Sequence, residues 1–146
     1  MKVENLDIPE RIKQDYIDSG ITKLNPPQRK AVDAGLMDGE DMIVASPTAS
    51  GKTFIAELAM VNQIKKEGGK DESGDYLETA DIVIVTSEKL DSMLRHNPSW
   101  IHEINLVVTD EIHLLTSPNR GPTLEVTLTR LRDLLDFQML GLSATI

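Results

Sequence analysis

Four short apolar runs recur along the chain, at residues 42–45, 82–85, 106–108 and 139–142. Each run is rich in Val, Ile, Leu or Met and lacks the alternation of polar and apolar residues that a half-exposed strand shows. Runs of this kind are typical of parallel strands that are buried on both faces. The pattern therefore predicts four strands of a parallel sheet.

Helical patterns separate these runs. Phe54, Leu58 and Val61 share one face of a helix that is expected to end at Gly68 and Gly69. A leucine stripe with Pro122 near its first turn predicts a second helix, at Leu124, Leu128, Leu131 and Leu135. A third helix is expected to begin with Ser87 as its N-cap and to carry Leu90 and Leu94. Strands that alternate with helices indicate βαβ units and an α/β fold.

Two more helices are predicted ahead of the first strand. One covers about residues 9–20, and the other begins with Asn25 as N-cap and Pro26 in the first turn and ends around Gly39. The segment 65–81 combines two glycines with an acidic stretch and is expected to be a surface loop.

Composition limits the classes of protein to which the chain can belong. Its 146 residues, 40% of them apolar, suffice for one domain with a buried core. The net charge of -9 argues against a protein that coats nucleic acid through bulk positive charge. The absence of cysteine excludes disulfides, thiolate metal sites and cysteine nucleophiles. No apolar run approaches the ~20 residues that span a bilayer, so we expect an intracellular protein without a membrane partner.

Residues 46–53, Ser-Pro-Thr-Ala-Ser-Gly-Lys-Thr, stand between a predicted strand and a predicted amphipathic helix. In a phosphate-binding loop, backbone N–H groups face the phosphates, the lysine reaches the β and γ phosphates, and the last hydroxyl ligates Mg²⁺. The general motif begins with glycine, where this chain has serine. The alternative is a helix N-terminus that carries Gly-Lys-Thr by chance, and the flanking elements disfavour it. The residues expected to contact ATP are Ser46, Pro47, Thr48, Ala49, Ser50, Gly51, Lys52 and Thr53, with Thr53 also a Mg²⁺ ligand.

An acidic pair, Asp110 and Glu111, directly follows the apolar run 106–108. Ligands of open α/β sheets bind at the carboxyl ends of the strands. Asp110 is predicted to hold Mg²⁺ through water, and Glu111 to position and deprotonate the water that attacks the γ-phosphate. Alone, an Asp-Glu pair after a strand more often lies in a solvent-exposed turn. A phosphate-binding loop in the same sheet favours the catalytic interpretation instead.

Three segments, residues 46–53, 110–113 (Asp-Glu-Ile-His) and 143–145 (Ser-Ala-Thr), resemble in this order motifs I, II and III of superfamily-two DExH helicases. The flanking segments 26–28 (Pro-Pro-Gln), 86–92 and 117–125 resemble the archaeal Ski-two-like repair helicases of the Hjm type. The resemblance covers nearly the whole chain. It implies a P-loop NTPase with a RecA-like parallel sheet and flanking helices.

The resemblance also implies roles for residues outside the loop. Gln28 corresponds to a glutamine that senses adenine, and with Asn25 as N-cap it also stands at the capping-box position. These two roles could coexist. His113, Ser143 and Thr145 would couple the nucleotide site to the strand-binding face, through hydrogen bonds between the hydroxyls and the 110–113 segment.

Thr86 and Ser87 resemble the family segment that contacts the nucleic-acid backbone, where hydroxyls bind phosphate without positive charge. For Ser87 a plain N-cap role is an equal alternative. Arg120 belongs to a segment whose use, structural or strand-contacting, the sequence leaves open. His96 and His102 have no metal-ligating companions and are expected to be spectators.

The chain departs from the family pattern in two ways. The family has a strand, motif Ia, a helix and another strand after the phosphate-loop helix, so several dozen residues are missing near 70–71. By the same resemblance we expect the chain to lack the family's second motor domain, whose arginine finger is worth ~10³–10⁵ in rate. We therefore expect an incomplete first motor domain, with a helical segment bearing the Q-type motif at 1–40 and the RecA-like part at 41–146. The loss of strands is expected to leave apolar surface uncovered.

The resulting hypothesis is the ATP-binding part of an ATP-dependent DNA helicase, by resemblance a 3′–5′ translocase acting at replication forks. ATP and Mg²⁺ are the expected cofactors and DNA the expected partner, in the cytoplasm beside the nucleoid. The isolated chain is expected to hydrolyse ATP weakly and to grip DNA weakly. The alternative is a non-catalytic remnant or interaction module. A small metabolite kinase is disfavoured, because the 110–113 and 143–145 segments have no role in one.

Overall fold

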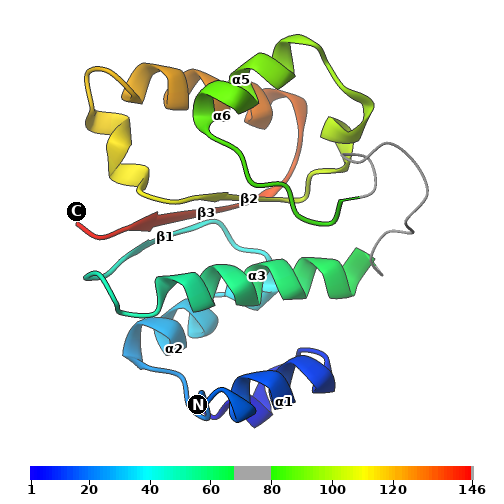
Figure 1. The fold of residues 1–146 in the computed structure, drawn as a ribbon, viewed down its shortest axis with the longest axis vertical. Helices are drawn as coiled ribbons and strands as arrows, with labels where there is room; N and C mark the ends of the chain where they lie inside the picture. The colour runs from blue at the N-terminus through cyan, green and yellow to red at the C-terminus, as the bar shows by residue number, and fades with distance from the viewer. Residues whose placement is uncertain (68–79, 146) are drawn as a thin grey trace.

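The computed structural model describes residues 1–67 and 80–145 and contains a parallel sheet between two layers of helices (Figure 1). Its strands are β1 (Met42–Ala45), β2 (Leu106–Thr109) and β3 (Gln138–Ser143), in the order β1-β3-β2. Ala45 pairs with Ser143 and Thr109 with Gly141, so all three strands end at the same edge of the sheet. The structure thus confirms three of the four predicted strands and the α/β fold.

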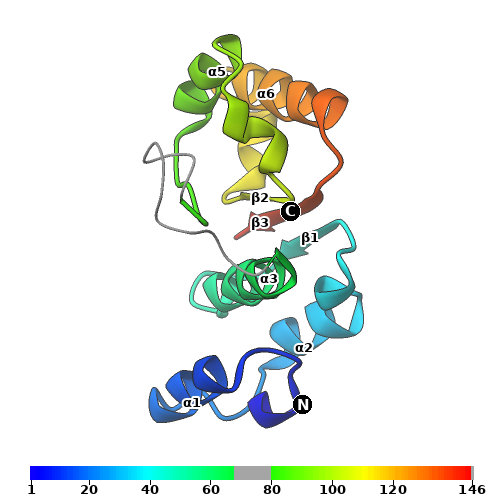
Figure 2. The same ribbon diagram turned by 90° about the vertical axis from the view of Figure 1, so that its right-hand side faces the viewer.

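One face of the sheet is covered by α3 (Lys52–Glu67), below which lie α2 (Pro26–Asp33) and α1 (Glu10–Asp18) (Figures 1 and 2). The short 3₁₀ helices η1 (Val3–Asn5) and η2 (Leu36–Asp38) belong to the same layer. We call the buried residues here the α3-side core: Val3, Leu6, Ile8, Leu24, Ala31, Leu36, Phe54, Ile55, Ala56, Leu58, Ala59, Leu140 and Leu142.

The opposite face is covered by α5 (Ser87–Arg95) and α6 (Gly121–Leu134), together with η3 (Ser99–Glu103) and η4 (Ile112–Thr116). The buried residues of this layer form the α6-side core: Trp100, Ile101, Leu131 and Phe137. In the described part of the chain, no helix is both long enough and apolar enough to cross a membrane.

The fourth predicted strand, residues 82–85, is wrong. This run has neither helical nor strand structure, and Ile84 is 90% exposed. A strand needs a neighbour to receive its backbone hydrogen bonds, and isolated extended segments are not stable. Within the described residues the sheet ends at β2, so the run has the composition of a strand but no partner.

Two predicted helix boundaries are also wrong. The helix expected over 25–39 ends at Asp33, because Gly35 takes a left-handed φ of 96° and the chain continues as η2. The N-cap of α5 is Thr86 and not Ser87, since the Thr86 hydroxyl accepts a hydrogen bond from Lys89 N at 3.2 Å. The helices expected from residue 9, from the phosphate loop and along the leucine stripe are confirmed as α1, α3 and α6. Of the predicted loop 65–81, residues 65–67 belong to α3 and 68–79 lie outside the described residues.

Candidate functional site

The predicted phosphate-binding loop joins β1 to α3 at the carboxyl edge of the sheet. Ser46 is buried, and its backbone N donates to Ser143 O at 3.1 Å, which fixes the start of the loop to the end of β3. Ala49 and Gly51 take left-handed φ angles of 63° and 79°. Alternating right- and left-handed residues turn successive N–H groups to one side, as anion-binding loops require.

Lys52 folds back over this loop. Its Nζ donates to Ser46 O at 2.5 Å and to Pro47 O at 2.9 Å. Phosphate oxygens are stronger acceptors for an ammonium group than neutral carbonyls. The lysine is therefore held where it could exchange these carbonyls for phosphates, while Thr53 lies exposed in the first turn of α3.

The first turn of α2 supports the loop from behind. The capping box predicted for Asn25 and Gln28 is confirmed, since the Asn25 side chain accepts from Gln28 N and Gln28 Oε1 accepts from Asn25 N. In addition, Asn25 Nδ2 donates to Ser50 O at 2.7 Å and Gln28 Nε2 to Gly51 O at 3.3 Å. A Cβ on Gly51 would lie 2.4 Å from Gln28 Nε2 and would displace that amide, and the left-handed φ of 79° strains any other residue at this position. The sequence pattern indicated the cap but not these contacts to the loop.

The acidic pair follows β2 directly, next to the phosphate loop's own edge of the sheet. Asp110 is exposed, and its Oδ1 accepts from Glu111 N at 2.9 Å. Glu111 has a left-handed φ of 54° and leads into η4. Its Oε2 is buried and accepts no hydrogen bond within the described residues, although His113 Nδ1 lies 3.2 Å away.

His113 connects this segment to β3. Its Nδ1 lies 3.0 Å from Ser143 Oγ, and Ser143 is 2% exposed. The Ser143 hydroxyl donates to Thr145 O and accepts from Thr145 N. Because that hydroxyl proton is already used, we assign the proton shared with the histidine to His113 Nδ1.

The three motif-bearing segments thus form one connected set of contacts. It runs from Lys52 through the Ser46 backbone to Ser143, and from the Ser143 hydroxyl to His113 beside Glu111. The roles assigned to these residues from sequence stay predictions, but the structure brings the residues together.

Thr86 and Ser87 lie apart from this set, at the N-terminus of α5. Hydrogen bonds from its own backbone N–H and from the Thr86 hydroxyl lower the pKa of Glu88. This places a carboxylate beside the hydroxyls that were predicted to meet a nucleic-acid backbone. Arg120, His96 and His102 are all exposed, and His96 Nδ1 lies 2.8 Å from Ser92 O.

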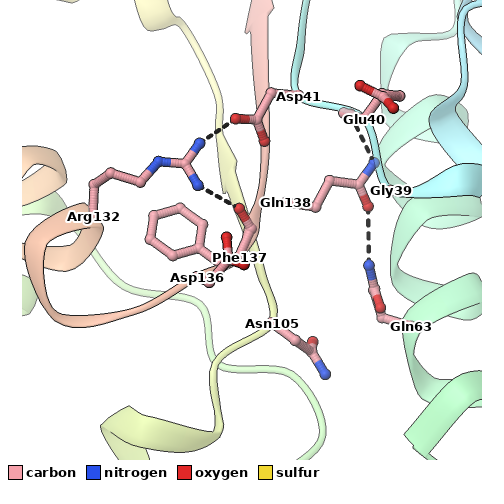
Figure 3. A pocket seen from close by; sticks show the side chains of 9 residues that line it. All are labelled: Gly39, Glu40, Asp41, Gln63, Asn105, Arg132, Asp136, Phe137 and Gln138. Carbon is pink, nitrogen blue, oxygen red and sulfur yellow. Dashed lines mark hydrogen bonds and ion pairs between the residues drawn. The ribbon is translucent and has the colours of Figure 1, made fainter.

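A hollow of about 390 Å³ lies at the opposite, amino-terminal edge of the sheet (Figure 3). Four of its polar side chains, those of Asp41, Gln63, Arg132 and Gln138, are paired with one another or with the backbone. Arg132 pairs with Asp41, donates to Phe137 O at 2.6 Å and lies 4.6 Å from the Phe137 ring centroid. The Gln138 amide donates to Leu36 O and Glu40 O and accepts from Gln63. The contacts at this edge tie the start of β3 to neighbouring elements, and they lie at the other end of the strands from the phosphate loop.

Comparison with known proteins adds family information to this geometry. The sequence profile described as "DEAD/DEAH box helicase" matches residues 25–76 and 69–146. The chain is 41% identical over 187 residues to the ATP-dependent DNA helicase Hel308 of Methanocella arvoryzae, covering 100% of this chain and 25% of the relative. It is 42% identical over 181 residues to Hel308 of Pyrococcus horikoshii, with the same coverage. The chain therefore spans about a quarter of the length of these relatives.

Among solved structures, the chain resembles the Mycobacterium smegmatis helicase Lhr bound to ssDNA and AMP-PNP. The TM-score is 0.69 at 19% sequence identity, and the match covers 100% of this chain and 26% of that one. At this identity the similarity bears on the fold, and it supports a RecA-like arrangement of sheet and helices.

Proposed function

The chain belongs to the DEAD/DEAH box helicase family, and from that premise we propose that it is the ATP-binding part of an ATP-dependent DNA helicase. The observation that carries the proposal is the connected set of contacts at the carboxyl edge of the sheet. It links the phosphate loop, the acidic pair and the Ser-Ala-Thr segment through Ser46, His113 and Ser143. A phosphate loop alone would support any P-loop nucleotidase, whereas the linkage to His113 and Ser143 supports a motor.

The residues of the site fit ATP with Mg²⁺. Ser50 Oγ and Glu111 Oε2 are buried and have no hydrogen-bond partner among the described residues, which is typical of sites that a ligand completes. The loop amides and Lys52 would hold the phosphates. In the described part of the chain no three His, Cys, Asp or Glu side chains gather into a metal site. Nucleotide-bound Mg²⁺ usually takes one or two protein oxygens besides phosphates and waters, and Thr53 and Asp110 would supply them.

Glu111 is the proposed base, because its carboxylate is close to the phosphate-loop edge and not neutralised by a hydrogen bond. His113 Nδ1 lies 3.2 Å from that carboxylate and 3.0 Å from Ser143 Oγ, so it would transmit a change in the position of the carboxylate to β3. When bound, Mg²⁺ would offset the negative charge of the phosphates. The adenine contact of Gln28 stays part of the proposal, since its amide still has a second hydrogen and a second lone pair for the base.

DNA as the partner, the fork-type substrate and a cytoplasmic location beside the nucleoid rest on similarity to the Hel308 helicases. So does the division into a helical segment at 1–40 and a motor part at 41–146. The absence of a family segment near 70–71 is supported by two facts. The alignments run over 181 to 187 residues against 146 in this chain, and the family profile matches in two pieces that meet at residues 69–76.

The proposal is tested by titrating the chain with a fluorescent ATP analogue in Mg²⁺, in parallel with Lys52→Ala. Lys52 makes charge-assisted contacts worth roughly 1.5–3 kcal/mol each, so the variant should bind at least about tenfold more weakly. Lys66→Ala, which removes an exposed lysine from the far end of the same helix, is the matched control and should bind as the parent does. Equal affinity of parent and Lys52→Ala would contradict the proposal and favour a non-catalytic interaction module.

A further inference from the structure

One edge of the sheet has no partner in the part of the chain that the structure describes. The strand order β1-β3-β2 leaves β2 paired with β3 alone. Gln138 N donates to Asn105 O at 3.0 Å. The alternation of a parallel ladder then turns the backbone N–H and C=O of Leu106 and Val108 toward the outer edge. No strand in the described part of the chain pairs with these groups, so one more strand could bond to them.

The chain also carries a strand-forming run that pairs with no strand among residues 1–67 and 80–145. Residues 82–85, Ile-Val-Ile-Val, are β-branched throughout, a composition that favours strands. The side chains of Ile82, Ile84 and Val85 are all exposed. In both ribbon views the stretch that leads into α5 lies on the β2 side of the sheet (Figures 1 and 2).

We propose that two copies of this chain associate by pairing the run 82–85 of each copy with the β2 edge of the other. The exchange is reciprocal, as a two-fold dimer requires. Strand addition satisfies the outward backbone groups of Leu106 and Val108 and buries the exposed apolar side chains. Neither segment contains a charged side chain, so the net charge of -9 is not concentrated along the contact.

The comparisons bear on why this edge is open, and the run 82–85 bears on what can cover it. The family profile breaks at residues 69–76, directly ahead of the run, and the relatives' alignments are longer than this chain. The family therefore has chain at this point that is absent here. Among the described residues, the run 82–85 is an exposed, uncharged segment that could take the place of the missing strand. Each copy of the chain carries one such run and one β2 edge, so two copies can satisfy both edges.

The test is light scattering coupled to size-exclusion chromatography over a range of protein concentrations. The molar mass should rise from 16.2 kDa toward twice that value. Ile84→Lys should stay monomeric, whereas Val126→Lys, at an exposed apolar position on α6, should dimerise as the parent does. Both side chains are exposed, so neither change should unfold the chain, and circular dichroism checks this. Hydrogen exchange at the amides of Leu106 and Val108 should slow as the dimer forms.

Three results would overturn the inference: a monomer at every concentration, a dimer that survives Ile84→Lys, or equal loss of the dimer in both variants. The last would indicate general apolar adhesion. Dimerisation is independent of nucleotide binding, so Lys52→Ala should dimerise normally and failure of one proposal leaves the other standing.

Discussion

The two helical layers on either side of the sheet differ in the extent of their buried apolar cores. The α3-side core runs without interruption from η1 to β3. The α6-side core is smaller, and exposed apolar side chains surround it, among them Leu115, Val126 and Leu134. Ile43 of β1 is also exposed, because its neighbours Met42 and Val44 turn toward the α3 side.

This difference follows the position of the proposed site. The phosphate loop begins on β1, continues into α3 and is supported by α2, all parts of the well-filled layer. The thinner layer adjoins the open edge of β2. The loop proposed to bind phosphate is therefore supported mainly from the α3 side of the fold.

Leucine-to-alanine substitutions, one in each core, test the difference between the two layers with the largest expected effect. Leu58 and Leu131 are both fully buried, one in each core, so Leu58→Ala and Leu131→Ala remove the same group. Buried Leu→Ala changes cost roughly 2–5 kcal/mol, and the cost is larger where the surroundings cannot relax. We expect Leu58→Ala near the upper end of that range and Leu131→Ala near the lower end, measured by urea unfolding. Equal losses would mean that the two layers are equally well packed.

Much of the fold was predictable because its signals are local. The strands at 42–45, 106–108 and 139–142 and the Asn25–Gln28 cap followed from short patterns, whereas the partnership of His113 with Ser143 was implied by the family resemblance. The prediction of a strand at 82–85 was wrong, because the run has the composition of a strand but no neighbouring strand within the described residues.

The support of the phosphate loop by Asn25 was missed for a related reason. Asn25 and Ser50 are 25 positions apart, and Gln138 contacts Leu36 across 102 positions. Only the packing of elements reveals such contacts. Asn25 also satisfied a local pattern as an N-cap, so nothing in the sequence called for a second role.

The variants Asn25→Ala and Gln28→Ala distinguish support of the loop from contact with the adenine base. Loss of the Asn25 cap should cost about 1 kcal/mol of stability. Because the Asn25 side chain contacts the loop and the first turn of α2 but is not proposed to contact the base, Asn25→Ala should weaken ATP and GTP binding by the same factor. Gln28→Ala should weaken ATP more than GTP, since Gln28 is also the proposed adenine contact. The two affinities are measured by calorimetry, and identical ratios for both variants would leave Gln28 with a positioning role alone.

A smaller effect is expected from Tyr16 on the α3 side. Burial, followed by the nearby Glu57 carboxylate, raises the pKa of Tyr16 to about 12. The folded state therefore favours the neutral phenol. This contribution to stability is complete below about pH 10 and is lost as the pH rises toward about 12. Tyr16→Phe keeps the ring contact with Phe54 and should flatten this decline. Unfolding free energies compared between about pH 9 and about pH 11 test this, and parallel curves for both proteins would contradict it.

The central claim is that the nucleotide binds at the carboxyl edge of the sheet, where the loop between β1 and α3 meets the ends of β2 and β3. Hydrogen–deuterium exchange with and without ATP and Mg²⁺ tests it most directly. We predict slower exchange at residues 46–53, 110–113 and 143–145, unchanged exchange in α5 and α6, and no response in Lys52→Ala. Protection confined to the hollow around Arg132 and Gln138, or no nucleotide-dependent change at residues 46–53, would contradict the claim.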